Sequence, residues 1–181
     1  MEFVNIVQTR RSVRKFKQDR ISKETIDKII QLASYSPSWK NTQTTRYIAI
    51  EDETMKSSIA ENCVMGFEMN QNTINGAPCL VLVNTITSRS GFERDGSFST
   101  SKGTHWESFD AGLATQTFCL AAHELGIGTV VLGVFDESKV IDLASVPEGQ
   151  KVSAMISLGY PNETPEMPKR KTVEDLLIYK G

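Results

Sequence analysis

The sequence predicts one domain in which helices cover both faces of a central β-sheet. Three observations lead to this prediction. The chain has 181 residues, which is enough to bury a sizeable core. The run PCLVLVNT, at 78–85, is typical of a strand that is buried on both faces. Helical and strand-like patterns alternate along the chain, so helices are available for both faces of a sheet.

Two helices are predicted before the first strand. The segment EFVNIVQ, at 2–8, places its apolar side chains on one helical face. A second helix begins after Ser22, a good N-cap, and Ile21 and Ile26 have the spacing of a hydrophobic staple. This helix must end near Pro37, because the residue before a proline avoids the helical region.

The middle of the chain is predicted to contain two strands, a helix and a long loop. RYIAIED, at 46–52, alternates as a strand does, and residues 53–64 form a helical pattern before the buried strand at 78–85. Residues 86–104 are polar and contain three glycines and five serines. A loop of this length is either mobile or functional.

The longest helical pattern is HWESFDAGLATQTFCLAAHELG, at 105–126. Its small residues allow another element to approach closely, and Gly126 is a natural C-cap. The remaining predicted elements are a strand at 129–135, a helix at 137–145, a strand at 152–160 and a short closing helix at 173–180.

Composition excludes several classes of protein. A formal net charge of -2 provides no overall field that attracts nucleic acid. No apolar run approaches the roughly 18 residues of a membrane span, and the N-terminus lacks the apolar core of a signal peptide. Cys63, Cys79 and Cys119 are scattered, which argues against a disulfide framework or a zinc site and predicts a cytoplasmic location.

A cationic segment, TRRSVRKF at 9–16, predicts an anion site in this slightly acidic chain. Arg10, Arg11 and Arg14 present planar forks of donors that fit phosphate oxygens, and Ser12 adds a directional hydroxyl. The basic triplet at 169–171 is a candidate to complete a phosphate clamp begun by Arg10. The alternatives are a solvated charged turn and a solvent-exposed tail.

Two further segments are candidates for ligand contact. SPSWKNTQ, at 36–43, offers polar side chains that hydrogen-bond amide-like edges, together with Trp39; the alternative is an ordinary helix-ending loop. GIGTVVLGVF, at 126–135, follows a helix and precedes a strand, which is the reverse of the dinucleotide-binding fingerprint. Gly133, late in a predicted buried strand, indicates close approach of a ligand or another backbone.

Side-chain catalysis has no support in the sequence. His105 and His123 have no partner at metal-ligand spacing, and we interpret both as structural or surface residues. The chain has no GxSxG nucleophile elbow and no carboxylate pair that stands out.

Taken in order, these segments resemble the nitroreductase family of flavin-dependent oxidoreductases, and the resemblance covers nearly the whole chain. The segments concerned are RRSVRKF at 10–16, PSWKNTQ at 37–43, Ala77–Pro78 before a strand, DAGLATQTFCLAAHELGIGTVVLG at 110–133, and LGYP at 158–161 before a basic tail.

The resemblance implies an α+β fold, with a central mixed β-sheet flanked by helices, over a single domain at 1–181. Residues 86–104 would be a polar loop and 161–181 a C-terminal tail. It also implies a homodimer with FMN at the subunit interface. The residues implied to bind FMN are Arg10 and Arg170 at the phosphate; Arg11 beside them; Ser12 near the phosphate or ribityl chain; Arg14 at the pyrimidine end; Pro37, Ser38, Trp39 and Asn41 from the other subunit; the backbone of Val131, Leu132 and Gly133 against the isoalloxazine ring; and Asn70.

The activity implied is hydride transfer from NAD(P)H through FMN to a nitroaromatic, quinone or enone by a ping-pong mechanism, with no catalytic side chain. A fixed cation at Arg14 would favour the reduced, anionic flavin. Thr44 and Thr45 depart from the family pattern of Pro and an aromatic, which puts the local packing or the acceptor pocket in doubt. The loop at 86–104 is expected to shape the same pocket, with Trp39, Phe92, Phe98 and Trp106 as candidate stacking surfaces.

Three alternatives stay open at this stage. The first is a specialised flavin reductase or dehalogenase of the same fold. The second is a protein that stores or senses FMN without turning over NAD(P)H. The third is a small interaction domain that binds no flavin and has only a charged N-terminal face.

Overall fold

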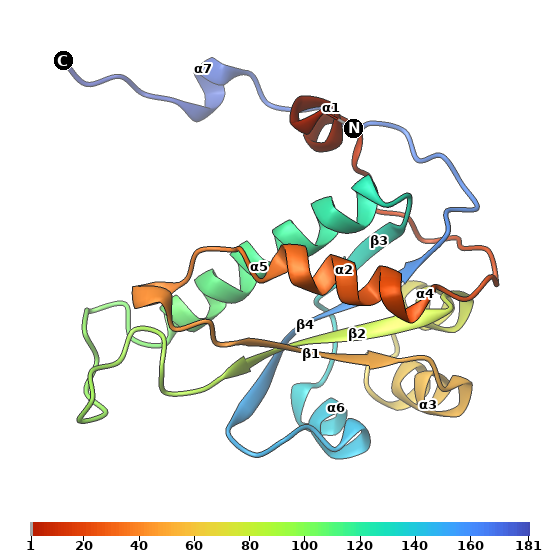
Figure 1. The fold of residues 1–181 in the computed structure, drawn as a ribbon, viewed down its shortest axis with the longest axis horizontal. Helices are drawn as coiled ribbons and strands as arrows, with labels where there is room; N and C mark the ends of the chain where they lie inside the picture. Colours follow the sequence, from red (N-terminus) through yellow and green to blue (C-terminus); the bar gives the residue numbers. More distant parts are fainter. Residues whose placement is uncertain (1) are drawn as a thin grey trace.

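The computed structural model describes residues 2–181 and shows a four-stranded sheet between two layers of helices (Figure 1). The helices of the described chain are α1 (Phe3–Thr9), α2 (Lys23–Ala33), α3 (Glu53–Asn62), α4 (Glu68–Gly76), α5 (His105–Glu124), α6 (Glu137–Ala144) and α7 (Val173–Leu176), with a 3₁₀ turn at Trp39–Asn41. The strands are β1 (Thr45–Ile50), β2 (Cys79–Ile86), β3 (Gly128–Leu132) and β4 (Gln150–Gly159).

The sheet confirms the α+β class but differs from the predicted mixed sheet. Its order is β1-β2-β4-β3, and every neighbouring pair of these strands is antiparallel. A short parallel bridge joins Ser12 to Thr129 outside the named strands. Periodicity in a sequence predicts how deeply a strand is buried, but not its direction, which depends on the connections between strands.

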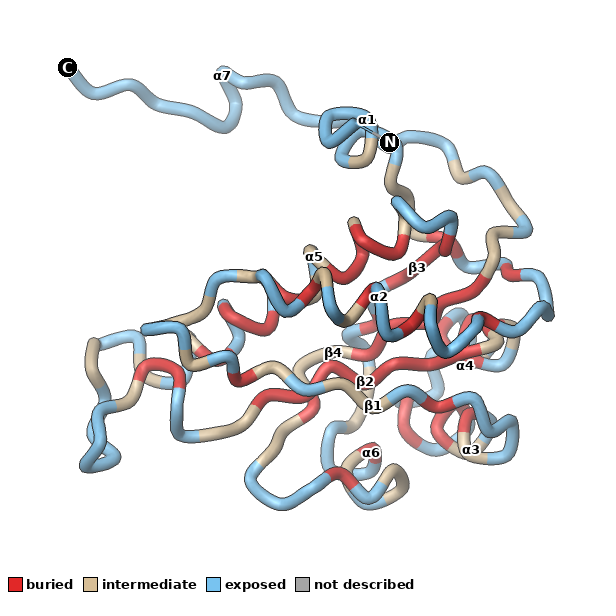
Figure 2. Tube along the Cα trace, in the orientation of Figure 1, coloured by how far each residue is buried: buried red, intermediate tan, exposed pale blue. Residues whose placement is uncertain are grey.

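Helices cover both faces of the sheet, as predicted. On one face, Val81 and Val83 of β2 pack in a core that includes Phe118 of α5. On the other face, Leu80 and Leu82 pack in a second core that also contains α3, α4 and α6 side chains. Figure 2 shows the resulting buried band through β2 and β4, flanked by helices with exposed outer sides.

The helix boundaries follow local signals wherever such signals exist. The Ser22 side chain accepts a hydrogen bond from the Thr25 backbone amide, which confirms the predicted N-cap of α2. Gly126 follows α5 with φ +76°, the left-handed conformation expected of a C-terminal glycine. The sequence did not predict α4, because its Asn, Thr and Gly residues are weak helix formers. Packing of the fully buried Ile74 stabilises α4 instead.

The two sides of α5 differ. Its small residues Ala111, Ala114 and Ala122 are buried, whereas the large side chain of Phe109 is 56% exposed. Leu125, just beyond the helix, is also exposed. Phe109 is the only large apolar side chain that α5 exposes in the described chain, because the other exposed positions of this helix are polar or glycine.

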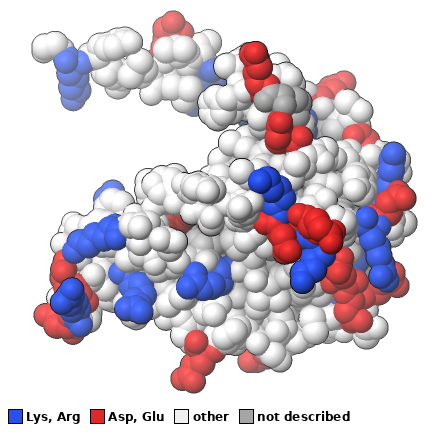
Figure 3. Space-filling model, viewed as in Figure 1, with Lys and Arg blue, Asp and Glu red and all other residues white. Residues whose placement is uncertain are grey.

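The C-terminal tail leaves the body of the molecule. Residues 161–171 return toward α1, and the chain then continues through α7 into solvent (Figures 1 and 3). Leu176, Ile178 and Tyr179 are largely exposed, the last at 88%. The predicted closing helix at 173–180 is only Val173–Leu176, because a Thr172–Asp175 capping box starts it but no tertiary packing extends it.

None of the helices in the described part of the chain is both long enough and apolar enough to span a membrane. Cys63, Cys79 and Cys119 are all buried free thiols, and burial raises the pKa of Cys79 to about 12.

Candidate functional site

Five residues that the sequence predicts to contact FMN line one cavity of about 360 Å³. They are Arg10, Arg11, Ser12, Arg14 and Arg170, and we call this site the cationic cavity. Pro165, Glu166 and Pro168 complete its lining. The structure therefore brings Arg170 of the basic triplet back to the N-terminal arginines, while residues 169–171 all remain exposed to solvent.

Backbone pairing positions the N-terminal side of the cationic cavity. The Val13 amide donates to the Thr129 carbonyl at 3.0 Å, which attaches this segment to the edge of β3. Gly128 permits this close approach, because an added Cβ there would lie 2.9 Å from Cβ of Val13. The Arg11 guanidinium donates to the carbonyls of Gln8 and Arg10 at the end of α1, so Arg11 supports the backbone of the site.

Glu163 attaches the tail to the same segment. Its Oε1 accepts from the backbone amides of Arg14, at 2.6 Å, and Lys15, at 3.2 Å. The Asn162 amide donates in turn to the Lys15 carbonyl at 2.9 Å. These contacts fix the start of the tail and direct its later residues toward Arg10.

The guanidinium groups of Arg10 and Arg170 are available to a ligand. Within residues 2–181, neither has a hydrogen bond or an ion pair, in contrast to Arg11. Two free planar forks around one cavity are suited to an anion with several oxygens, such as a phosphate.

His123 is a neighbour of the cationic cavity that the sequence did not assign to it. Its Nε2 lies 2.8 Å from Oγ1 of Thr9, which ties α1 to the last turn of α5. Burial, followed by the positive charges of Arg10 and Arg11, lowers the pKa of His123. A neutral imidazole at pH 7 adds no charge to the site, which agrees with its interpretation as a structural residue.

A larger cavity, of about 800 Å³, continues from Ser12 and Arg14 toward α4, where Met69 and Thr73 line it. Asn70 does not line it: its buried side chain donates from Nδ2 to the Val134 carbonyl at 3.1 Å. Asn70 therefore supports the segment that follows β3.

The backbone at the end of β3 lies at the surface of the molecule. Leu132 is buried, whereas Val131 and Gly133 are exposed. The prediction that Gly133 lies late in a buried strand is wrong, because β3 ends at Leu132. Among residues 2–181, no atom lies within 4 Å of a Cβ added at Gly133, so the surface there is open.

The remaining predicted contacts, Pro37, Ser38, Trp39 and Asn41, lie in a strained loop that we call the 37–43 loop. Lys40, Asn41 and Gln43 have φ values of 45°, 54° and 48°. Left-handed backbone costs roughly 1–2 kcal/mol for a residue with a Cβ. Ser38 compensates locally, since its Oγ accepts from the Gln43 amide at 2.9 Å.

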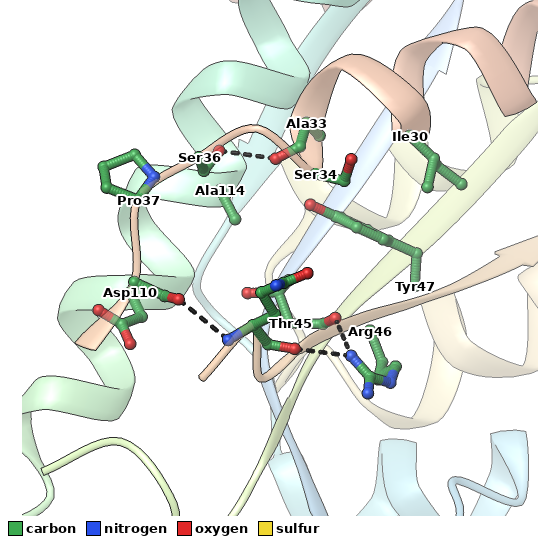
Figure 4. A pocket seen from close by; sticks show the side chains of 12 residues that line it. Ile30, Ala33, Ser34, Ser36, Pro37, Thr45, Arg46, Tyr47, Asp110 and Ala114 are labelled. Carbon is green, nitrogen blue, oxygen red and sulfur yellow. Dashed lines mark hydrogen bonds between the residues drawn. The ribbon is translucent and has the colours of Figure 1, made fainter. Parts of the chain in front are cut away.

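A buried carboxylate anchors the 37–43 loop. Asp110 of α5, only 3% exposed, accepts at Oδ2 from the Trp39 amide at 2.9 Å and from the Ser90 hydroxyl at 2.6 Å. Figure 4 shows Asp110 on α5 beside the segment that contains Pro37, at a cavity of about 300 Å³ between α2 and α5.

Aromatic rings and charges also hold the 37–43 loop against the 86–104 loop. The rings of Trp39 and Trp106 are 4.6 Å apart between centroids. Nζ of Lys40 lies 3.1 Å from a carboxylate oxygen of Glu93 in an exposed ion pair. The indole nitrogen of Trp39 is buried without a partner in the described chain, so it remains free to donate.

The 86–104 loop has an anchor of its own. Glu107 of α5, 2% exposed, accepts from the Ser88 amide at 2.7 Å and from Nζ of Lys151 at 2.6 Å. Sequence reasoning missed both Glu107 and Asp110. A pattern that could have pointed to them is the spacing of two acids three residues apart in an otherwise weakly charged helix. This spacing places both side chains on one face of the helix.

The two groups of predicted residues lie near opposite ends of α5. Asp110 holds the 37–43 loop, and His123 lines a neighbouring cavity that shares Arg10 and Arg11 with the cationic cavity. Asp110 and His123 are thirteen positions apart along the helix, a distance of about 20 Å. A single chain therefore does not bring the 37–43 loop to the cationic cavity.

The site fits a flavin phosphate better than a metal ion. In the cationic cavity, the guanidinium groups of Arg10 and Arg170, which are unpaired within residues 2–181, provide donors for phosphate oxygens, and the Ser12 hydroxyl adds another. In the part of the chain that the structure describes, no three His, Cys, Asp or Glu side chains are grouped so as to hold a metal.

Comparison with known proteins agrees with this geometry. The model of the nitroreductase family matches residues 7–160. A curated relative from Archaeoglobus fulgidus, named "Putative NADH dehydrogenase/NAD(P)H nitroreductase", is 31% identical over 166 residues, which cover 90% of this chain and 87% of the relative. An iodotyrosine deiodinase from Thermotoga neapolitana is 23% identical, over 93% of this chain and 94% of its own.

Solved structures show the same fold. A nitroreductase family protein from Clostridium novyi NT has a TM-score of 0.78 and 27% identity, covering 93% of this chain and 89% of its own. A nitroreductase family protein from Streptococcus pneumoniae TIGR4 has a TM-score of 0.86 at 19% identity, over 99% of this chain and all of its own, 100%. The chain therefore belongs to the nitroreductase family.

Proposed function

We propose that the protein is an FMN-dependent oxidoreductase that uses NAD(P)H to reduce an electron-poor acceptor of the nitroaromatic, quinone or enone class. The observation that supports this most directly is the cationic cavity. It gathers Arg10, Ser12, Arg14 and Arg170 from two ends of the chain around a space of about 360 Å³.

Each residue of the cationic cavity has a distinct part in this proposal. Arg10 and Arg170 hold the FMN phosphate through charge-assisted hydrogen bonds, and Ser12 donates to the phosphate or the ribityl chain. Arg14, which lines both this cavity and the larger one beside α4, places its charge at the pyrimidine end of the ring. A fixed cation there stabilises negative charge in a site that needs no reorganisation.

The end of β3 provides the surface for the flavin ring. Val131, Leu132 and Gly133 present backbone groups, and Asn70 holds the next segment through Val134. The chemistry that bound FMN supplies is hydride transfer between NAD(P)H and the acceptor. The protein then needs only to bind, orient and shield the reactants, which agrees with the lack of a catalytic dyad in the sequence.

The second half of each site comes from a partner subunit in this proposal. The 37–43 loop is about 20 Å along α5 from the cationic cavity, so it completes a site on another copy. The exposed apolar side chains of α1, the outer side of α5 and the tail support a homodimer that covers them.

An absorption spectrum of the purified protein, followed by NADH or NADPH without air, tests the proposal. A flavin spectrum that bleaches supports it, and the faster nucleotide identifies the donor. A flavin spectrum that stays unbleached would instead favour storage or sensing of FMN. Absence of flavin after FMN is added would contradict FMN dependence.

Reductive dehalogenation is a second candidate. Its support is the similarity to iodotyrosine deiodinases, together with Trp39 and Trp106, which lie against each other where a flat aromatic substrate would meet the 37–43 loop. Thr44, which departs from the family pattern beside this loop, is buried and its hydroxyl has no partner in the described chain. Iodide released from an iodinated phenol by the reduced protein would favour this activity, and reduction of quinones alone would exclude it.

A further inference from the structure

We infer that Asp110 is a positioning residue that sets the conformation of the 37–43 loop and couples this loop to the 86–104 loop. The consequence for catalysis rests on the proposed function, in which the 37–43 loop completes the flavin site of the partner. The positioning itself depends only on contacts within one chain.

The geometry singles out one oxygen atom. Oδ2 of Asp110 accepts from the backbone amide of Trp39, at 2.9 Å, and from the hydroxyl of Ser90, at 2.6 Å. Asp110 is buried, so both hydrogen bonds form away from bulk water, where a charged acceptor is strongest. One carboxylate on a rigid helix therefore holds two loops that are far apart in the sequence.

The 37–43 loop needs an external anchor. Three of its residues, Lys40, Asn41 and Gln43, have left-handed backbone without being glycine. Such strain persists only where the surrounding structure enforces it, and it gathers at functional sites. The local contacts through Ser38 close the turn, but only Asp110 among the described residues ties the Trp39 amide to a helix.

The ring of Trp39 depends on the same anchor. Its backbone amide bonds to Asp110, and its ring packs on Trp106, one turn earlier on α5. Because the indole nitrogen has no partner in the described chain, the side chain of Trp39 does not fix the loop through a hydrogen bond of its own. Movement of the amide would therefore move the ring that faces the partner's site in the proposed dimer.

Glu107 is a natural control. It is equally buried and lies one turn away on the same face of α5, but its hydrogen bonds in the described chain are with Ser88 and Lys151 and not with the 37–43 loop. Loss of either carboxylate is expected to lower the stability of the protein. Only loss of Asp110 is expected to change the environment of Trp39.

The test uses Trp39 as a reporter. The chain has two tryptophans, so Trp106→Phe leaves Trp39 as the single tryptophan, whose fluorescence is excited selectively over that of the four tyrosines. In that background, acrylamide quenching is measured for the parent, Asp110→Asn, Ser90→Ala and Glu107→Gln, without flavin. We expect the quenching constant of Asp110→Asn to rise about twofold or more, with a smaller rise for Ser90→Ala and none for Glu107→Gln.

Equal quenching constants in the Asp110→Asn and Glu107→Gln variants would overturn the inference. If both constants rose equally, the cause would be a general loss of packing, and if neither rose, Asp110 would not position Trp39. The comparison does not require FMN, so it remains decisive if the proposed function fails.

A second measurement tests the consequence for catalysis. In otherwise native chains loaded with FMN, Asp110→Asn should lower kcat/KM for a quinone about tenfold, while Glu107→Gln changes it less than about threefold. If the quenching constant changes but kcat/KM does not, Asp110 still positions the loop. That result would contradict the proposal that the loop lies at the partner's flavin.

Discussion

The cationic cavity and the 37–43 loop would contribute to the proposed flavin site in different ways. In the cationic cavity, the guanidinium groups of Arg10 and Arg170 have no partner in residues 2–181, so the identity of the side chains determines the site. In the 37–43 loop, strained backbone is held in place by Asp110 from another element. The cationic cavity therefore depends on the charge of its side chains, whereas the 37–43 loop depends on a backbone conformation that neighbouring elements maintain.

This difference determines what a substitution does in each region. A change in the cationic cavity should alter affinity for an anion and leave the fold intact, because those side chains are not part of the core. A change in the supports of the 37–43 loop should alter geometry first and affinity only as a consequence. The predictions below test this distinction, from the largest expected effect to the smallest.

Phe109→Asp should break the proposed dimer and so separate the cationic cavity of one copy from the 37–43 loop of the other. The Phe109 ring is exposed on the outer side of α5, and burying it is worth about 1.5–3 kcal/mol, whereas burying an unpaired carboxylate is strongly unfavourable. We expect a monomer by light scattering, with weakened FMN binding. The control is Phe109→Leu, which keeps an apolar side chain at the same position and should remain a dimer. A Phe109→Asp protein that remains a dimer would show that this side of α5 is not the interface.

Arg10→Ala should affect the cationic cavity alone. Loss of a charge-assisted contact to phosphate costs about 1.5–3 kcal/mol, which is roughly a 10- to 100-fold rise in the Kd for FMN. Titration of the apoprotein by flavin fluorescence measures it. Lys169→Ala is the matched control, because Lys169 adjoins Arg170 but does not line the cavity. An unchanged Kd in Arg10→Ala would refute the phosphate assignment.

Tyr47→Phe tests the cavity beside the 37–43 loop through pH. Burial raises the pKa of Tyr47 to about 12 from its ordinary 10.0, so the folded state favours the neutral phenol. This shift contributes on the order of 3 kcal/mol to the free energy of unfolding. The contribution is complete below pH 10 and is lost as the pH rises from 10 to 12. Denaturant unfolding should therefore show a shallower decline of stability for Tyr47→Phe in this window.

The stability of the Tyr47→Phe protein should still decline somewhat as the pH rises above 10, because burial also raises the pKa of the Cys79 thiol to about 12. Near pH 7 the variant should be as stable as its parent, since the Tyr47 hydroxyl is buried without a partner in the described chain and its removal breaks no hydrogen bond. Identical slopes in the two proteins above pH 10 would contradict this account of Tyr47.

Gln43→Gly should relieve strain in the 37–43 loop. Gln43 has a φ of 48°, which glycine adopts freely, and its exposed side chain has no hydrogen bond among residues 2–181. We expect the free energy of unfolding to rise by about 0.5–1 kcal/mol. Asp19→Gly, at an exposed position without positive φ, should instead lower it. A Gln43→Gly protein less stable than its parent would show that the loop is not strained there.

The contrast between the two regions also explains how far the sequence could predict the molecule. The five residues of the cationic cavity were predicted because arginine forks and a serine are readable as side chains. The two-faced burial of β2 and the N-cap at Ser22 were predicted for the same reason, since each depends on local residue types. The anchors Asp110 and Glu107 were not predicted, because an acid in a helix is ordinarily exposed and only tertiary contacts bury it.

Other errors have related causes. The direction of the strands and the existence of α4 depend on contacts distant in sequence, so weak local propensity misled the prediction of α4. Gly133 was placed inside a strand because its apolar neighbours continue the pattern beyond Leu132, where the structure ends β3.

The most direct measurement of the central claim is complementation between two defective chains. One chain combines Arg10→Ala with Arg170→Ala, and the other has Asp110→Asn with Trp39→Ala; each should bind FMN weakly alone. If the cationic cavity of one copy uses the 37–43 loop of another, a mixed dimer has one intact site. Unfolding and refolding the chains together in equal amounts should then restore about a quarter of the FMN sites. FMN binding no greater than that of the separate chains would contradict the claim that each site is shared between two copies.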